Sequence, residues 1–228
     1  MDGPGIRFVV FLQGCPLRCL YCHNRDTWDF KGGREVTVPV VMQEIRKYTS
    51  YMKFSGGGLT VTGGEPLYQP DFVQALLQQC QQEDIHTAVD TSGYVTFEKV
   101  KQVFDETDLV LLDLKCLDHQ RHKLLTGVEL PRILEFARNL SELGKPMWIR
   151  HVLVPGWTDQ EELLHTLGEF VATLNTVEVV EILPFHKMGE YKWEELGCPY
   201  QLKDVPSPTK KQLKHALEIL QHYHPNVR

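Results

Sequence analysis

Three cysteines, Cys15, Cys19 and Cys22, lie within one short segment of the chain, and His23 and Asn24 follow directly. Thiols at this spacing can surround one metal centre, and a purely structural role is the simplest alternative. A structural zinc ion needs a fourth ligand, and no second closely spaced pair of cysteines follows. The Cys-x-x-Cys-His order also matches the attachment pattern of a c-type haem, which would leave the first cysteine without a role. An iron-sulfur cluster on three thiols keeps one iron open to a ligand, so the segment favours a reactive cluster.

A second group of polar residues follows the apolar runs of the sequence. Gly63 and Gly64 would let the backbone approach a ligand closely, and Glu65 could bind an ammonium group. A tight turn before a helix is the alternative for these three residues. Asp113 and Lys115 are two residues apart and therefore share a face of a strand, where they could hold hydroxyl and carboxylate groups. The simpler alternative for this pair is a salt bridge.

Short apolar runs rich in Val, Ile, Leu and Phe alternate with amphipathic segments, as in buried parallel strands followed by helices. The expected strands span residues 7–13, 59–62, 86–90, 109–114, 147–154 and 177–184. We expect helices at residues 38–52, 72–80, 96–106, 132–143 and 163–174, and a last helix for which Ser207 and Pro208 are a good N-cap and first-turn pair. Thr158 and Glu161 have the spacing of a capping box. The long segment between residues 185 and 208 is predicted to be a functional loop.

Six strand-helix units predict an α/β fold, a partial (β/α)6 TIM-like barrel with parallel strands, as a single domain over residues 1–228. A complete eight-unit barrel usually needs about 250 residues, and an open doubly wound sheet is the alternative. In the barrel, the carboxyl ends of the strands would carry Cys15, residues 63–65, Asp90, residues 113–115 and His186. Active sites of such barrels assemble at this face, so we expect one site there.

The composition excludes several other classes of protein. Lys and Arg total 24 and Asp and Glu total 30, so the net charge is −6, and the scattered basic residues offer no footprint for nucleic acid. The apolar runs are far shorter than the roughly 20 residues of a membrane span, so we expect no membrane partner. The amino terminus lacks a secretory signal and the six cysteines form no spaced disulfide framework, which favours a cytoplasmic protein.

The Cys-x3-Cys-x2-Cys spacing, with an aromatic residue just before the last cysteine, resembles the radical S-adenosylmethionine superfamily. Further segments along nearly the whole chain resemble the pyruvate formate-lyase activating enzymes of that superfamily, namely residues 2–7, 21–28, 63–66, 90–93, 113–115, 148–150, 154–157 and 183–186. No cysteine lies between Cys22 and Gly63, so the resemblance implies a single cluster. Family members usually carry additional residues before the first of these segments, and we therefore expect strand one to be less protected than the other strands.

The resemblance implies three cofactors, a [4Fe-4S] cluster, S-adenosylmethionine and a monovalent cation, K⁺ or Na⁺. The implied cluster ligands are Cys15, Cys19 and Cys22. The implied S-adenosylmethionine site comprises Tyr21, Cys22, His23, Asn24, Gly63, Gly64, Glu65, Asp113, Leu114, Lys115 and His186, and the implied cation site comprises Asp90, Thr91 and Asp113. Lys115, Arg150 and Asp2 are also implied to act in catalysis, the last two at the loop of the protein substrate. For Arg150 and Asp2 the alternative is an ion pair at the barrel rim.

The implied activity is that of a radical oxidoreductase working under anaerobic conditions. Reductive cleavage of S-adenosylmethionine would give a 5′-deoxyadenosyl radical, which would form a glycyl radical on pyruvate formate-lyase. Flavodoxin or ferredoxin is the implied electron donor. Two alternatives are an activase of a related glycyl radical enzyme and a non-catalytic, metal-stabilised barrel that binds proteins. Of the other cysteines, Cys80 and Cys116 are expected to pack in the interior and Cys198 to be an inert loop residue.

Overall fold

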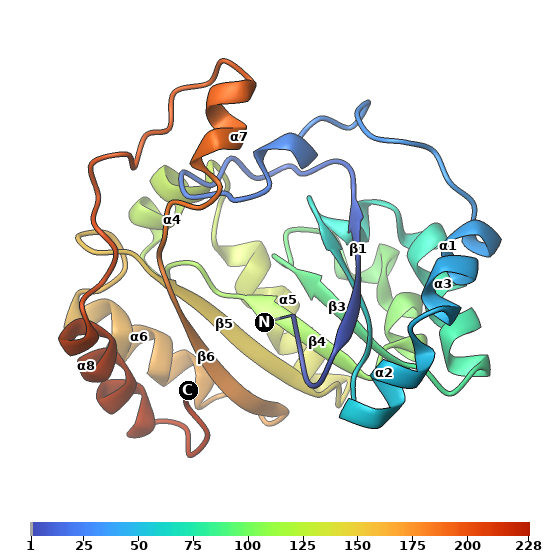
Figure 1. Cartoon of the computed structure of the whole chain (residues 1–228). Coiled ribbons are helices and arrows are strands. Elements are labelled where there is room, and N and C mark those ends of the chain that lie inside the picture. The colour runs from blue at the N-terminus through green and yellow to red at the C-terminus, as the bar shows by residue number, and fades with distance from the viewer. Residues whose placement is uncertain (1) are drawn as a thin grey trace.

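The computed structural model describes residues 2–228 and contains one six-stranded sheet in which neighbouring strands are parallel (Figure 1). The strands are β1 (Arg7–Leu12), β2 (Gly58–Gly63), β3 (His86–Thr91), β4 (Leu109–Asp113), β5 (Met147–Leu153) and β6 (Val177–Pro184). The predicted strands are confirmed to within one residue at each end. Their order in the sheet is their order in the sequence. A doubly wound sheet needs a reversal of strand order, so that alternative is wrong.

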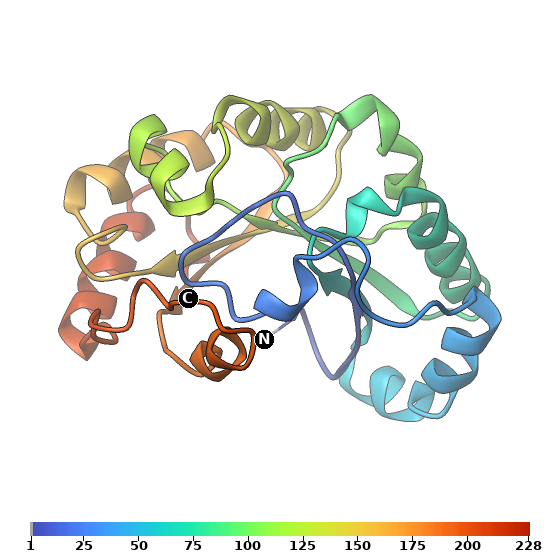
Figure 2. The same cartoon turned by 90° about the horizontal axis from the view of Figure 1, so that it is seen from above.

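The sheet curves into an arc, and the main helices cover its convex side (Figure 2). Among the described residues no hydrogen-bonded pairing joins β1 to β6, so the arc is a partial barrel, as predicted. The last residues of the chain pair with β6 instead, since Ile182 N donates to Arg228 O (2.8 Å) and Arg228 N donates to Val180 O (3.0 Å). Within the described chain β1 pairs with β2 alone, and the lower protection of strand one stays a prediction.

The helices are α1 (Val38–Arg46), α2 (Thr49–Ser55), α3 (Pro70–Gln82), α4 (His119–Thr126), α5 (Pro131–Glu142), α6 (Glu161–Val171), α7 (Glu190–Glu195) and α8 (Lys210–Gln221). Short 3-10 helices span Arg25–Thr27, Pro66–Tyr68, Phe97–Lys99 and Lys101–Glu106. None of the helices described is long and apolar enough to cross a membrane.

Two predicted helices differ from the structure, and two further helices were not predicted. The predicted helix at 38–52 is divided, because the chain turns at Lys47 and Tyr48 between α1 and α2. The predicted helix at 96–106 is a pair of 3-10 helices, in which Val103 N donates to Val100 O, three residues back (2.9 Å). Neither α4 nor α7 was predicted, and both are short.

Two helices also begin at other caps than the sequence predicts. Thr158 does not cap α6, because its Oγ1 accepts from Val154 N (2.8 Å) and donates to Val152 O (2.7 Å), which closes the turn after β5. The cap of α8 is Thr209, whose Oγ1 accepts from Gln212 N while the Gln212 side chain accepts from Thr209 N. This reciprocal arrangement is a capping box.

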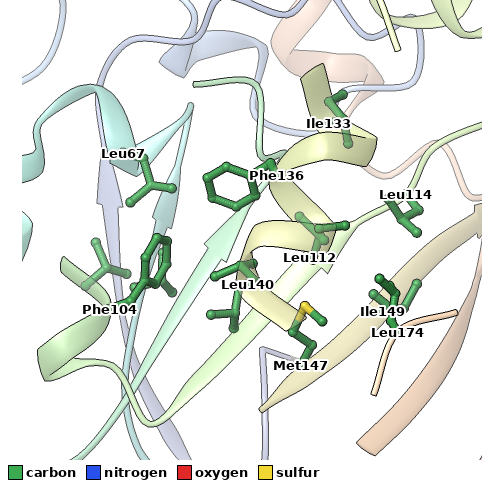
Figure 3. Close-up of a cluster of buried hydrophobic side chains, with 14 of the residues drawn as sticks. Leu67, Phe104, Leu112, Leu114, Ile133, Phe136, Leu140, Met147, Ile149 and Leu174 are labelled. Carbon is green, nitrogen blue, oxygen red and sulfur yellow. The ribbon is translucent and has the colours of Figure 1, made fainter. Parts of the chain in front are cut away.

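Side chains on the outer face of the sheet pack beneath the helices in one large core (Figure 3). Phe104 and Phe136 are fully buried at its centre, and the Phe136 ring lies edge-on to Phe97 at 5.5 Å and to Phe104 at 5.8 Å between centroids. Cys80 is fully buried in the same core, as expected. This packing fixes β2 to β5 from outside, so that their carboxyl ends keep a constant spacing.

The concave face of the sheet carries a small apolar cluster below a set of charged side chains at the carboxyl ends of the strands. A small buried cluster on that face consists of Ala88, Leu109, Leu111, Trp148 and Val179. Side chains two residues apart on a strand share a face, so the next positions on β3, β4, β5 and β6 are Asp90, Asp113, Arg150 and Glu181. Arg150 is in register with both Asp113 and Glu181. The parallel strands therefore bring four charged side chains to one end of the barrel.

Candidate functional site

The loop that follows β1 carries the three cysteines and is closed by backbone hydrogen bonds. Gly14 N donates to Thr27 O (2.8 Å) and Cys15 N donates to Trp28 O (3.3 Å). Arg18 braces the loop, since its Nη1 donates to Cys15 O (2.7 Å). Burial raises the pKa of the Cys15 thiol to about 12. The loop is thus a fixed structure that holds its thiols away from water.

Cys22 is held by two tryptophans that are far apart in the sequence. Trp28 Nε1 donates to Cys22 Sγ (3.3 Å), and Trp193 Nε1, from α7, donates to Cys22 O (2.9 Å). The two indole rings meet edge to face with centroids 5.2 Å apart. The guanidinium of Arg25 lies 4.3 Å from the centre of the Trp28 ring. The predicted loop at 185–208 therefore contains a helix, α7, that covers the cysteine loop.

Gly63 and Gly64 end β2 where the backbone of β1 and its loop come closest. Gly64 N donates to Leu12 O (2.8 Å). A Cβ atom at Gly63 would lie 2.2 Å from Leu12 N and O, and one at Gly64 would lie 2.2 Å from Gly14 O. Gly63 also has a φ of +121°, which disfavours other residues. Only glycines fit here, and they expose backbone to the same space as the cysteine loop.

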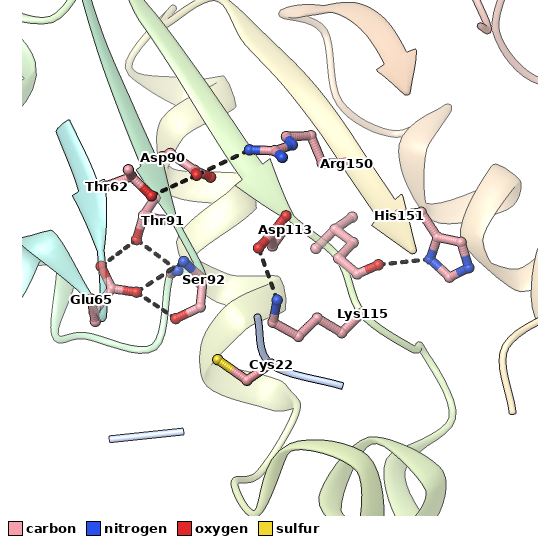
Figure 4. A network of polar contacts seen from close by, with 12 residues as sticks. Cys22, Thr62, Glu65, Asp90, Thr91, Ser92, Asp113, Lys115, Arg150 and His151 are labelled. Carbon is pink, nitrogen blue, oxygen red and sulfur yellow. Dashed lines mark hydrogen bonds and ion pairs between the residues drawn. The ribbon is translucent and has the colours of Figure 1, made fainter. Parts of the chain in front are cut away.

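The side chain of Glu65 turns into the protein (Figure 4), and its predicted contact with an ammonium group stays a prediction. The residue is fully buried, Oε1 accepts from Thr91 Oγ1 (2.6 Å), and Oε2 accepts from Ser92 N (2.9 Å) and Ser92 Oγ. Burial raises the pKa of this carboxyl group, and the hydrogen bonds from Ser92 and Thr91 oppose that rise. Glu65 ties the end of β2 to the end of β3.

Two ion pairs stand at the carboxyl ends of β3, β4 and β5 (Figure 4). Lys115 Nζ lies 2.8 Å from Asp113 Oδ2, and Arg150 Nη1 lies 3.0 Å from Asp90 Oδ2. Burial alone would raise the pKa of Asp113, but the charges of Lys115 and Arg150 outweigh it and hold that pKa below its usual range. Burial keeps the pKa of Asp90 raised despite the neighbouring Arg150. The salt bridges named above as alternatives for Asp113, Lys115 and Arg150 are thus present.

Leu114 contributes its backbone to this region, and its side chain is buried in the outer core. The predicted contact of Leu114 with a cofactor stays a prediction. His151 Nδ1 donates to Leu114 O (2.8 Å), and burial lowers the pKa of His151, which favours the neutral ring. This hydrogen bond fixes the chain between Asp113 and Lys115 (Figure 4).

His186 follows β6 and stacks on His23 with ring centroids 4.3 Å apart. His23 Nε2 donates to His186 O (2.8 Å). Burial is the main cause that lowers the pKa of His186, and the nearby His23 lowers it further. The two rings join the end of β6 to the cysteine loop.

These elements surround one cavity of about 570 Å³, a volume typical of small-molecule sites. The predicted site residues that line it are Asp2, Cys15, Cys19, Tyr21, Cys22, His23, Asn24, Gly63, Gly64, Asp90, Thr91, Asp113, Lys115, Arg150 and His186. Glu65 and Leu114 are outside the lining. Other residues that line the cavity were not predicted from the sequence, among them Trp28, Thr62, Ser92, Val152 and Phe185. Trp28, Ser92 and Phe185 belong to segments that resemble the family, so a signal existed for them, whereas Val152 reads as an ordinary apolar position.

The donors in this cavity suit an iron-sulfur cluster better than a single metal ion. Cysteine thiolates are the usual ligands of such clusters, and here all three thiols come from one loop and line one cavity. Within residues 2–228 no three His, Cys, Asp or Glu side chains are close enough together to hold a single ion. The buried hydroxyl of Tyr21 has no hydrogen-bond partner among the described residues and is available to a bound group.

Comparison with known proteins assigns most of the chain to one family. The model of the Radical SAM superfamily matches residues 9–167. The pyruvate formate-lyase 1-activating enzyme of Escherichia coli (strain K12) is 47% identical over 227 residues, which are 98% of this chain and 92% of that protein. The pyruvate formate-lyase-activating enzyme of Staphylococcus aureus (strain NCTC 8325 / PS 47) is 48% identical over 223 residues, 95% of this chain and 89% of that protein.

Two solved structures illustrate the likeness in three dimensions. A domain of a pyruvate-formate lyase-activating enzyme from Bacteroides vulgatus ATCC 8482 matches 75% of this chain and 98% of its own, with a TM-score of 0.65 and 30% identity. SuiB of Streptococcus suis, bound to S-adenosylmethionine, matches 98% of this chain and 50% of its own, with a TM-score of 0.76. Its identity of 17% shows a shared fold alone.

Proposed function

The chain belongs to the radical SAM superfamily and, within it, to the pyruvate formate-lyase activating enzymes, and on that basis we propose that it forms a glycyl radical on a pyruvate formate-lyase. In this family a reduced [4Fe-4S] cluster supplies the electron that cleaves S-adenosylmethionine, and the resulting 5′-deoxyadenosyl radical takes a hydrogen atom from a glycine. The observation that carries the proposal is the position of the three cysteines, which line the same cavity as the charged ends of β3, β4 and β5.

Each wall of the cavity has a proposed role in binding. Cys15, Cys19 and Cys22 would hold the cluster. The backbone at Gly63 and Gly64 would approach the amino acid part of S-adenosylmethionine, because no side chain obstructs it there. For the rest of the cofactor, we assign Tyr21, His23, Asn24, Asp113, Lys115 and His186, all of which line the cavity.

The ion pair between Lys115 and Asp113 would open when the cofactor binds. The Lys115 ammonium can donate to the carboxylate of S-adenosylmethionine in place of Asp113. Asp113 can then accept hydrogen bonds from the ribose hydroxyls. Both groups are nearly buried, with side chains 11% and 24% exposed, so neither charge has water as an adequate substitute partner. The pair would thus hold both charges in place until a ligand replaces it.

The protein substrate would enter through the side of the barrel that the sheet leaves open, between β1 and β6. Asp2 and Arg150 line the cavity and would contact its glycine loop. For K⁺ or Na⁺ we assign Asp90, Thr91 and Asp113, whose oxygen atoms suit a hard cation. Flavodoxin or ferredoxin would supply the electron. All six cysteines are free thiols, which supports a reducing, cytoplasmic compartment.

The test is anaerobic reconstitution with iron and sulfide, followed by reduction with flavodoxin and addition of S-adenosylmethionine and pyruvate formate-lyase. We expect 5′-deoxyadenosine and the electron paramagnetic resonance (EPR) signal of a glycyl radical. Cys19→Ala should abolish both, whereas Cys80→Ala, which removes a buried thiol outside the cavity, should retain both. A cluster-loaded protein that gives neither product would refute the proposal. Deoxyadenosine without a radical on this partner would point to a related glycyl radical enzyme.

A further inference from the structure

We propose that Trp28 raises the reduction potential of the cluster by donating its indole N–H to the sulfur of Cys22, an inference that rests on the proposed function. Trp28 Nε1 lies 3.3 Å from Cys22 Sγ, within the distance of a hydrogen bond to sulfur. Trp28 is 8% exposed and lines the cavity, so water does not compete for this sulfur from the indole side.

The direction of the effect follows from charge. A cluster becomes more negative when it accepts an electron, and its thiolate ligands share that charge. A hydrogen bond to a ligand sulfur therefore stabilises the reduced form more than the oxidised form, and such bonds are among the features that set cluster potentials. In a site with little water the bond is stronger than in solution.

The surroundings of Trp28 keep the indole in this position. The guanidinium groups of Arg25 and Arg18 lie 4.3 Å and 4.9 Å from the centre of its ring. The edge-to-face contact with Trp193 and the backbone bond between Cys15 N and Trp28 O fix the ring and the main chain. The positive charges beside the ring also increase the donor strength of its N–H.

Trp193 provides a matched control, because its indole donates to the backbone oxygen of the same cysteine and not to sulfur. We would reconstitute the wild type, Trp28→Phe and Trp193→Phe and determine the cluster midpoint by redox titration followed by EPR. At the wild-type midpoint, Trp28→Phe should show a reduced-to-oxidised ratio about tenfold lower, equivalent to a midpoint about 59 mV lower. Trp193→Phe removes only a bond to the backbone oxygen and keeps an aromatic ring against Trp28, so its midpoint should shift by much less than that of Trp28→Phe.

A second measurement is made on protein that keeps Trp28, so it does not depend on whether Trp28→Phe retains a cluster. In protein labelled with ¹⁵N at the indole nitrogen, pulsed EPR of the reduced cluster should detect a ¹⁵N coupling, and Trp193→Phe should keep it. Absence of that coupling, or equal midpoints for the wild type and Trp28→Phe, overturns the role of Trp28 while leaving deoxyadenosine formation intact. A wild type that binds no cluster overturns this inference together with the proposed function.

Discussion

Replacing Arg150 with methionine would leave the Asp90 carboxylate without its cationic partner in the wall of the cavity. The two side chains are only 12% and 14% exposed and their charged atoms are 3.0 Å apart. Removing one partner of such a pair costs about 3–5 kcal/mol. Asp90 keeps a hydrogen bond from Thr62 Oγ1 (2.8 Å), so we expect a loss near the lower limit, about 3 kcal/mol. At roughly 2–4 °C per kcal/mol for a chain of this size, the melting temperature should fall by about 6–12 °C.

The double variant Asp90→Asn/Arg150→Met distinguishes the effect of losing the ion pair from the effect of changing the packing of the Arg150 side chain. Both charges are then absent and the asparagine oxygen still accepts from Thr62, so the part of the lost stability that belongs to this pair should return. Glu181, which lies 3.8 Å from Arg150 Nε, loses that contact in both variants and keeps Arg228 as a partner (3.3 Å). Calorimetry and urea unfolding at pH 7 would measure all three proteins. As the pH falls, the deficit of Arg150→Met should shrink, because a protonated Asp90 needs no counter-charge.

A surface ion pair gives the reference for this experiment. Arg46 and Glu83 also form a close pair, but their side chains are 51% and 30% exposed. Arg46→Met should therefore cost far less stability than Arg150→Met. The reasoning fails if Arg150→Met costs no more than Arg46→Met, or if the double variant is less stable than Arg150→Met alone.

Three further predictions concern the turn at Gly64, the loss of stability at low pH and the hydrophobic core. Gly64→Ala places a Cβ 2.2 Å from Gly14 O, so the cysteine loop must shift, and iron analysis after reconstitution should show reduced cluster content in a folded protein. Burial alone would raise the pKa of Asp108, but hydrogen bonds from Thr87 and Gln81 and the charge of His86 together hold it below its ordinary value of 3.8. The stability advantage over Asp108→Asn should be complete at pH 7 and vanish as the pH falls through the folded-state pKa. Phe136→Ala should cost about 3–5 kcal/mol in urea unfolding, and a loss under about 1 kcal/mol would contradict the packing described.

The sequence predicted the strands well because their apolar runs are short, β-branched and separated by polar turns. It predicted less about residues 96–106, since apolar positions three and four apart fit an α-helix and a 3-10 helix alike. The break between α1 and α2 and the helix α7 have little periodic signal of their own. In each case tertiary contacts decided the local structure.

In the candidate site, too, features formed by neighbouring residues could be predicted from the sequence, whereas contacts between distant residues could not. The crowding of Cys15, Cys19 and Cys22 is local and visible in the sequence. The orientation of Glu65 depends on hydroxyl groups of Thr91 and Ser92 on the neighbouring strand, which no local pattern reveals. The contact of Trp193 with Cys22 joins residues from opposite ends of the chain, so it could be found only in the folded structure.

The strand order of the sheet also has a consequence for the way the protein is made. Each strand pairs with the one translated just before it, so the growing chain can add units to the sheet in the order of synthesis. The cysteine loop leaves the ribosome early, together with β1, whereas His186 and Trp193, which cover it, emerge near the end. During most of translation the thiols are therefore present but uncovered. Delivery of iron and sulfide to the nascent chain would meet less obstruction than delivery to the finished protein.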